Sequence, residues 1–201
     1  MTEIRAIYWD LGGVLLRTMD RSRRRRWEER LSLSEGELDV AVFGCSASRK
    51  ATLGQGPSEA VWEEVRTRFR LSSPDGQALA ADFFADDRVD LALLDVLRQL
   101  RPFYRIGMIS NAWPDARQIL DEKLRISSYF DAVITSAEVG FAKPHPHIYR
   151  MALQALDITP EQAVFVDDFL ENVDAARALG MRTIHFRARD QALGELSLQL
   201  A

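Results

Sequence analysis

The chain has 201 residues, with 26 Lys and Arg against 30 Asp and Glu, a formal net charge of -4 and 47% hydrophobic residues. No uninterrupted apolar run exceeds four residues, which argues against a membrane-spanning helix, and the mild acidity argues against nucleic acid as the main partner, because phosphate backbones attract a basic face. The single cysteine, Cys45, excludes an internal disulfide, so we expect a cytoplasmic protein. The length predicts one domain, or one domain with a modest insertion.

Short apolar segments alternate with helical patterns along most of the chain. Strands are predicted at 4–9, 104–109, 131–135, 163–166 and 182–186, and helices at 90–101, 114–124, 147–156 and 170–179. Strands and helices that alternate in this way predict an α/β fold, with a doubly wound, mainly parallel, Rossmann-like sheet that is covered on both faces.

The stretch between the first and second strands differs from the rest. It contains no convincing strand, and Ser, Gly and Pro residues separate four or so short helical patterns. We therefore predict a core domain made of residues 1–16 and 89–201, with a small all-helical cap, or lid, at 17–88. Trp62, Val65 and Phe69 recur at helical spacing and are interpreted as cap core, with some of them available to line a substrate pocket.

Carboxylates stand where predicted strands end. Asp10 follows the first strand, and Asp167 and Asp168 close the strand at 163–166. Ligands of parallel sheets bind beyond the carboxyl ends of the strands, where three carboxylates would repel one another unless a divalent cation lay among them. Oxygen ligands without Cys or His favour Mg²⁺. The alternative is that each Asp caps a helix.

Two further features point to an anion. Lys143 is one of only three lysines and precedes Pro144, which favours an extended backbone at Lys143. A compact ammonium held there would suit neutralisation of a phosphoryl group, although a solvated surface lysine is the simpler interpretation. Ser110 and Asn111 close the second strand before a helix, as expected for an oxyanion-binding turn or a plain loop.

Taken in order, these segments resemble the four motifs of the haloacid dehalogenase superfamily of phosphohydrolases. The chain also resembles that superfamily's Asp-Leu-Gly sugar-1-phosphate phosphatase group and the N-terminal phosphatase domain of epoxide hydrolases. The matching segments are Tyr8-Trp9-Asp10-Leu11-Gly12-Gly13-Val14-Leu15, Met108-Ile109-Ser110-Asn111, Lys143-Pro144 and Val164-Phe165-Val166-Asp167-Asp168.

The resemblance implies a Mg²⁺-dependent phosphatase that acts on a small phosphorylated metabolite, such as a sugar phosphate. It makes Asp10 and Lys143 the catalytic residues, with Asp10 the nucleophile that forms an aspartyl-phosphate. The implied metal ligands are Asp10, Gly12 through its carbonyl oxygen, Asp168 and, in support, Asp167. The implied phosphate-binding residues are Gly12, Gly13, Ser110, Asn111 and Lys143.

One departure from the family pattern bears on activity. Gly12 stands where family phosphatases usually carry a second Asp that protonates the leaving group, so activity should be slower or limited to good leaving groups. Two alternatives follow from this departure. The chain could be a metal-independent 2-haloacid dehalogenase, or a phosphate-binding or regulatory protein that has lost turnover.

The arginine run at 21–26 invites a polyanion-binding interpretation. Because acidic residues follow it and the whole chain is acidic, we interpret it instead as the solvated face of a cap helix. We expect no membrane or nucleic-acid partner, and the sequence favours neither a monomer nor a homodimer.

Overall fold

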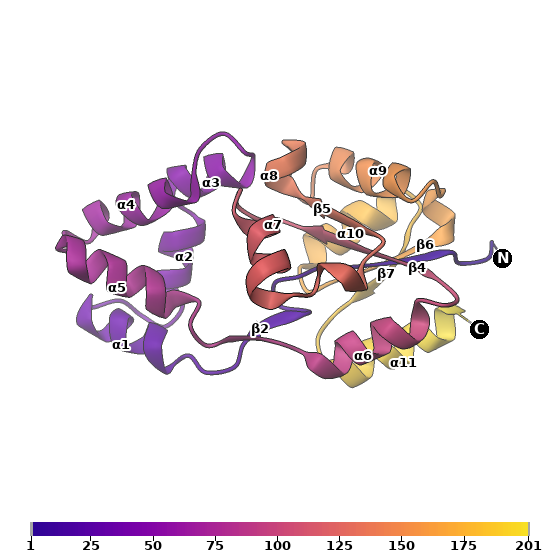
Figure 1. Ribbon diagram of the computed structural model, residues 1–201, viewed down its shortest axis with the longest axis horizontal. Helices are drawn as coiled ribbons and strands as arrows, with labels where there is room; N and C mark the ends of the chain where they lie inside the picture. The colour runs from indigo at the N-terminus through magenta and orange to yellow at the C-terminus, as the bar shows by residue number, and fades with distance from the viewer. Residues whose placement is uncertain (1, 201) are drawn as a thin grey trace.

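A five-stranded parallel sheet lies at the centre of the larger of two lobes in the computed structural model, which describes residues 2–200 (Figure 1). The strand order is β5-β4-β1-β6-β7, and the bounds are β1 Ala6–Trp9, β4 Arg105–Ser110, β5 Ala132–Thr135, β6 Ala163–Asp167 and β7 Arg182–His185. The predicted parallel α/β sheet is confirmed. Residues 1 and 201, the outer bounds of the predicted core domain, lie outside the described residues.

Helices cover both faces of the sheet, as the alternation of side chains along β1 requires. Ile7 and Trp9 belong to an apolar cluster with α6 (Leu91–Leu100) and α11 (Arg189–Leu200). Tyr8 belongs to a second cluster, with α9 (Pro146–Ala155) and α10 (Leu170–Ala178), on the opposite face. The central strand β1 is therefore held between two apolar layers, and Asp10 follows directly at its carboxyl end.

The remaining core segments are short. The helix predicted at 114–124 is split into one turn of α-helix followed by a π-helical segment, and α8 and α11 were not predicted. These short segments are α7 Ala116–Gln118, η1 Ile119–Leu124, η2 Ser127–Tyr129, α8 Ser136–Val139 and η3 Pro160–Gln162.

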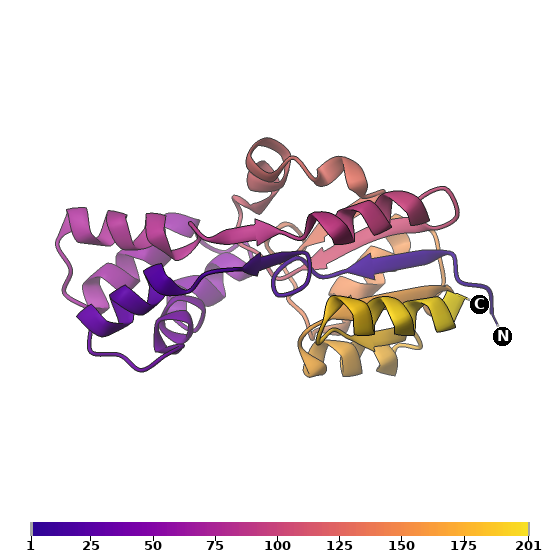
Figure 2. The ribbon, with the colours of Figure 1, turned by 90° about the horizontal axis from the view of Figure 1, so that it is seen from below.

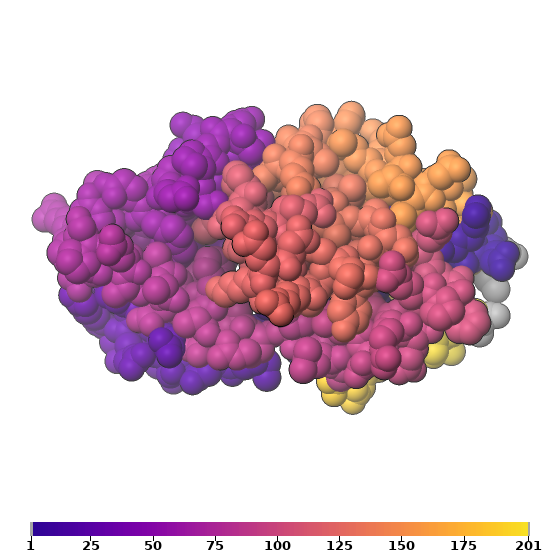
Figure 3. Space-filling model, in the orientation of Figure 1, coloured from indigo at the N-terminus to yellow at the C-terminus, as the bar shows by residue number. Residues whose placement is uncertain are grey.

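The smaller lobe consists of five helices around an apolar cluster of its own. They are α1 Ser22–Arg30, α2 Glu37–Phe43, α3 Ser46–Thr52, α4 Ser58–Arg68 and α5 Ser73–Phe83. The lobe lies beyond the carboxyl end of β1, and the two lobes touch on the face seen in Figure 3. Among residues 2–200, no helix is both long and apolar enough to cross a lipid bilayer.

Two short strands correct the expectation that 17–88 holds no strand. β2 (Leu16–Thr18) pairs antiparallel with β3 (Asp87–Val89), and together they form both chain connections between the lobes (Figure 2). Three residues are too few to show an alternating pattern in the sequence. Each strand is formed by its hydrogen bonds to the other, which lies about 70 residues away in the chain. The pair is braced by Asp90, which caps α6 and forms ion pairs with Arg17 and Arg189.

The arginine run differs from its predicted solvated role at one position. Arg24 is buried, donates to the Phe83 carbonyl oxygen and pairs with Asp39 and Asp87. Its neighbours Arg21 and Arg23 also pair with carboxylates of the same lobe. The run therefore ties α1 to the rest of the smaller lobe.

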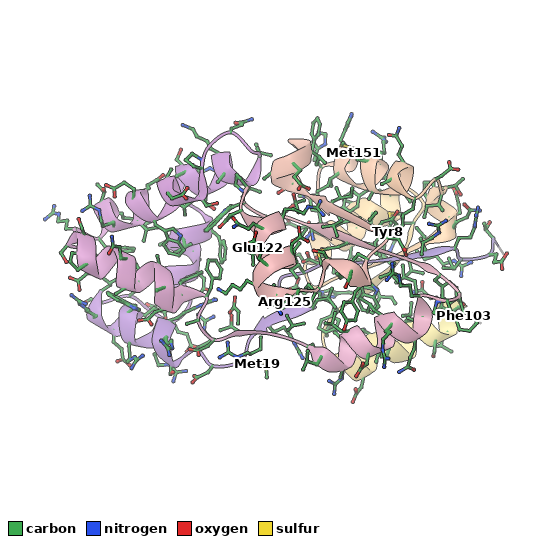
Figure 4. All side chains as sticks on the ribbon, viewed as in Figure 1. Tyr8, Met19, Phe103, Glu122, Arg125 and Met151 are labelled. Atoms are coloured by element: carbon green, nitrogen blue, oxygen red, sulfur yellow. The ribbon has the colours of Figure 1, made fainter. Side chains whose placement is uncertain are left out.

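Close packing inside the core generates a stability prediction at Gly107. This residue faces Tyr8 across the β1–β4 pairing, and a Cβ atom built on it would lie 2.3 Å from two Tyr8 ring atoms. Tyr8, which Figure 4 places inside the larger lobe, cannot move aside easily, because its hydroxyl donates to the Ala152 carbonyl oxygen at 2.6 Å. Gly107→Ala should lower the free energy of unfolding by about 1–3 kcal/mol, measured by urea denaturation.

Gly194 provides the control, since it lies in α11 and a Cβ there would meet no described atom within 4 Å. Gly194→Ala should be neutral or stabilise by up to about 1 kcal/mol, because alanine favours helix more than glycine does. Equal effects of the two substitutions would contradict the packing argument.

Candidate active site

The ends of three neighbouring strands bring the predicted site residues together. Trp9 of β1 pairs with Met108 of β4 on one side and with Val166 of β6 on the other. Asp10 follows immediately, and its backbone N–H donates to the Val166 carbonyl oxygen at 2.9 Å. Because the register aligns the three strand ends, Asp10 lies between Ser110 and the Asp167-Asp168 pair.

Lys143 bridges two of the carboxylates. Its Nζ lies 2.7 Å from Oδ1 of Asp10 and 2.7 Å from Oδ2 of Asp167, and its side chain is only 1% exposed. Asn111 fixes the backbone of Lys143 from both sides: its Nδ2 donates to the Lys143 carbonyl oxygen and its Oδ1 accepts from the Lys143 N–H. The Asn111 side chain is thus engaged in holding the lysine.

Asp167 is saturated with hydrogen bonds. Besides Lys143, it accepts from the backbone N–H of Phe169 at 2.8 Å, and both of its oxygens accept from Nδ2 of Asn172, at 3.0 and 3.1 Å. Asn172 was missed at the level of sequence. The available signal was an amide in the first turn of a helix that begins one residue after two aspartates. With every oxygen occupied, Asp167 serves to hold Lys143 in place.

Asp168 has the opposite character. Its Oδ1 is buried and finds no hydrogen-bond partner among residues 2–200. Its Oδ2 lies so near the loop after β1 that a Cβ on Gly13 would approach it to 2.1 Å. Gly13 has a φ of +79°, and glycine adopts this left-handed conformation readily because it lacks a Cβ. The loop can therefore reach Asp168 only with glycine at this position.

The other loop residues are placed as follows. The backbone N–H of Leu11 donates to Oδ1 of Asp10 at 2.7 Å, and that of Gly13 donates to the Leu16 carbonyl oxygen at 2.9 Å. A Cβ on Gly12 would meet none of the described atoms within 4 Å, so the space beside it is open. Ser110 is buried at the end of β4.

Burial and charge set the electrostatics of the site. Burial raises the pKa of Asp10 to about 7, against the opposing effect of Lys143. Burial alone would lower the pKa of Lys143, but the carboxylates of Asp10 and Asp167 outweigh it and hold that pKa above its ordinary value. Burial and then Asp167 raise the pKa of Asp168. Negative charge is therefore in excess here.

The residues present fit a divalent cation. Asp10, Asp167 and Asp168 bring carboxylate oxygens within 4.8 Å of one another, and of these the oxygens of Asp167 are already hydrogen-bonded. When all three are ionised, Lys143 balances only one of the charges. A hard cation with oxygen ligands would satisfy the unpartnered oxygen of Asp168 and offset the remaining charge.

Comparisons with known proteins show which proteins this chain is similar to. The sequence pattern of the haloacid dehalogenase-like hydrolases matches residues 4–180. The chain is 39% identical over 220 residues to bifunctional epoxide hydrolase 2 of Mus musculus, which covers 96% of this chain and 38% of the relative. It is 24% identical over 194 residues to D-ribitol-5-phosphate phosphatase of Bacteroides thetaiotaomicron, covering 90% of each. The chain thus spans less than half the length of the epoxide hydrolase.

A solved structure shares the fold. It is a haloacid dehalogenase family enzyme of Bacteroides thetaiotaomicron in complex with magnesium and inorganic phosphate, with a TM-score of 0.74 and 22% identity. The match covers 92% of this chain and 95% of that one.

The raised pKa of Asp10 predicts how stability depends on pH in metal-free buffer. In the unfolded chain Asp10 ionises near its ordinary value of 3.8, whereas in the folded protein it ionises near 7. Between these values the folded state holds the extra proton, so the stability contributed by Asp10 is present below about pH 4 and is lost as pH rises through 7. The free energy of unfolding of the wild type, relative to Asp10→Asn, should therefore fall across this range.

Urea denaturation of both proteins in EDTA, at steps from pH 4.5 to 8, measures the difference. A constant difference would mean that Lys143 keeps Asp10 ionised throughout this range.

Proposed function

This chain belongs to the haloacid dehalogenase-like hydrolase family, and we propose that it is a Mg²⁺-dependent phosphatase that hydrolyses a small phosphorylated metabolite through an aspartyl-phosphate on Asp10. The observation that carries the proposal is the buried Asp10 carboxylate, held by Lys143 at the sheet edge beside the unpartnered oxygen of Asp168. The similarity to D-ribitol-5-phosphate phosphatase supports a small phosphorylated metabolite as the substrate.

The proposed reaction runs in two displacements. A carboxylate oxygen of Asp10 attacks phosphorus, and the bond from phosphorus to the leaving oxygen breaks, so that this oxygen departs with its electron pair and takes a proton from solvent. Water then attacks the phosphorus of the aspartyl-phosphate and gives up a proton to solvent, while the bond from phosphorus to the Asp10 oxygen breaks. Asp10 is freed as a carboxylate and inorganic phosphate is released. The balance is one phosphomonoester and one water consumed, and one alcohol and one phosphate formed.

Each neighbouring side chain has a proposed part in these steps. Lys143 keeps Asp10 oriented and offsets the charge of the phosphoryl group, while Asp167, Asn111 and the newly found Asn172 hold Lys143 in position. The Ser110 hydroxyl, with backbone groups of the Gly12-Gly13 loop and around Asn111, would bind phosphoryl oxygens. The metal would be held by Asp10, the Gly12 carbonyl oxygen and Asp168. When bound, Mg²⁺ would supply positive charge to the phosphoryl oxygens.

The smaller lobe would act as a lid over this chemistry. It stands beyond the carboxyl end of β1 (Figure 1) and is joined to the core by the β2–β3 pair. We propose residues 17–88 as the cap, and we propose that cap residues select the substrate.

The metal-independent dehalogenase alternative has less support. That reaction does not need a cation, whereas the cluster of three carboxylates, with an oxygen of Asp168 left without a donor, fits one. The further alternative is a protein that binds phosphate at the same residues without hydrolysing an ester. Only a measurement of turnover separates it from the proposal.

Hydrolysis of p-nitrophenyl phosphate tests the proposal directly. Because its leaving group is good, the lack of a carboxyl group at Gly12 should not mask a working nucleophile. We expect turnover with Mg²⁺, its loss in EDTA, its return when excess Mg²⁺ is added back, and a fall in kcat of at least about a thousandfold in Asp10→Asn.

2-Chloropropionate is assayed in parallel. Chloride release that persists in EDTA, without phosphate release, would favour the dehalogenase. Magnesium and phosphate binding by calorimetry, without hydrolysis of any substrate, would favour the binding protein.

The open space beside Gly12 generates a second prediction. Gly12→Asp supplies the missing acid where a side chain fits, so it should raise kcat/KM for a poor leaving group, such as that of glycerol 3-phosphate, by about a hundredfold or more. For p-nitrophenyl phosphate the gain should be small. Gly12→Asn, of equal size but without an ionisable proton, is the matched control. Equal rates in the two variants would show that proton donation at this position does not limit the reaction.

A further inference from the structure

Aromatic side chains gather where the two lobes meet. Trp113, from the core loop after β4, lies about 6 Å, between ring centroids, from three rings of the smaller lobe: 6.0 Å from Phe43, 6.0 Å from Trp62 and 6.1 Å from Phe84. Phe83 packs edge-on beneath them and is buried. We call these five residues the aromatic cluster. Only Trp62 had been singled out from the sequence.

The aromatic cluster is connected to the proposed phosphate-binding residues through a very short loop. Trp113 stands three residues after Ser110 and two after Asn111, whose side chain holds Lys143. The Trp113 indole N–H donates to Oγ of Ser48, in α3, at 3.2 Å. Phe43 is the last residue of α2, and α2 lies on the side of the smaller lobe that faces the core (Figure 1).

Part of the surface of these rings is left exposed to solvent by the packing of the protein itself. Phe43 is 50% exposed, and Trp62, Phe84 and Trp113 are only partly buried. Burying exposed apolar surface is favourable in water, so an apolar group placed against these rings would gain affinity. A polyhydroxylated group would gain less, because the Trp113 donor is already engaged. The guanidinium that lies over the Phe83 ring, that of Arg24, is buried and already paired with Asp39 and Asp87.

The direction of the substrate also favours this placement. A phosphoryl group on Asp10 would lie beyond the strand ends, so its leaving group must extend away from the sheet, towards the smaller lobe. Trp113 follows Ser110 by three residues and packs against rings of the smaller lobe, so the aromatic cluster joins this strand end to that lobe.

We propose that the aromatic cluster binds the leaving group, and that the substrate is a phosphomonoester of an apolar alcohol or phenol about as large as one or two aromatic rings. This inference rests on the proposed phosphatase function and specifies its substrate class. It places apolar leaving groups ahead of the polyols of sugar phosphates.

Three substrates and two variants test the proposal. Phenyl phosphate and 2-naphthyl phosphate have leaving groups of similar acidity but different apolar area, and D-ribitol 5-phosphate carries a polyol. We expect kcat/KM of the wild type to be about tenfold higher for 2-naphthyl than for phenyl phosphate, mainly through KM, and lowest for the ribitol ester. Phe43→Ala should remove most of the naphthyl preference.

Val40→Ala is the matched control, because Val40 is 70% exposed, lies in the same helix and is outside the cluster. It should keep the preference. If Phe43→Ala lowers kcat/KM equally for all three substrates, or if the wild type does not prefer the naphthyl ester, the cluster is only a contact between lobes and the inference is wrong while the phosphatase stands.

If p-nitrophenyl phosphate is hydrolysed and none of the three esters is, the inference is wrong while the proposed function stands. If none of the four compounds is hydrolysed, both are wrong. Calorimetric binding of 2-naphthyl phosphate to Asp10→Asn, and to Asp10→Asn/Phe43→Ala, separates binding from turnover. The second protein should bind about tenfold more weakly, and equal affinities would contradict the proposal.

Discussion

The arrangement of the site depends on one buried ammonium group. Lys143 joins Asp10, at the end of β1, to Asp167, at the end of β6, and Asn111, beyond β4, fixes its backbone. One lysine therefore links three strand ends, and its charge pairs with the carboxylates at two of them. Removing one partner of a buried ionic group leaves the others uncompensated, at a cost of about 3–5 kcal/mol. The same charge that organises the site makes it intolerant of losing any member.

The two adjacent aspartates show how one dipeptide serves two purposes. Asp167 is buried, and a lysine, an amide and a backbone N–H donate to its oxygens, so its role is structural. Asp168 keeps an oxygen without a donor and approaches the glycine loop. The site is thus well supplied with fixed charge but has no carboxyl group at Gly12. Such a site stabilises charge on phosphorus better than it assists a reluctant leaving group.

What could be predicted from the sequence follows from how local each signal is. Buried parallel strands are continuous apolar runs, and the carboxylate after each run marks its end, so the sheet and Asp10, Asp167 and Asp168 were found. The β2–β3 pair was not, because it arises from two segments far apart in sequence. Arg24 looked solvated, since its partners lie outside its own helix. Asn172 and Trp113 look ordinary until the fold places them beside Asp167 and the smaller lobe.

The pairing of β2 with β3 has a consequence for the history of the chain. Thr18 and Asp87 are direct partners in the ladder, and the Thr18 hydroxyl donates to the Asp87 carboxylate. The chain leaves the core along β2 and returns to it along β3, so the β2–β3 pair holds these two points together. Lengthening a loop between fixed ends costs little free energy. A lobe inserted there can be enlarged, trimmed or exchanged for another without disturbing the sheet, so the proposed lid can diversify while the strand ends that carry Asp10, Asp167 and Asp168 are inherited unchanged.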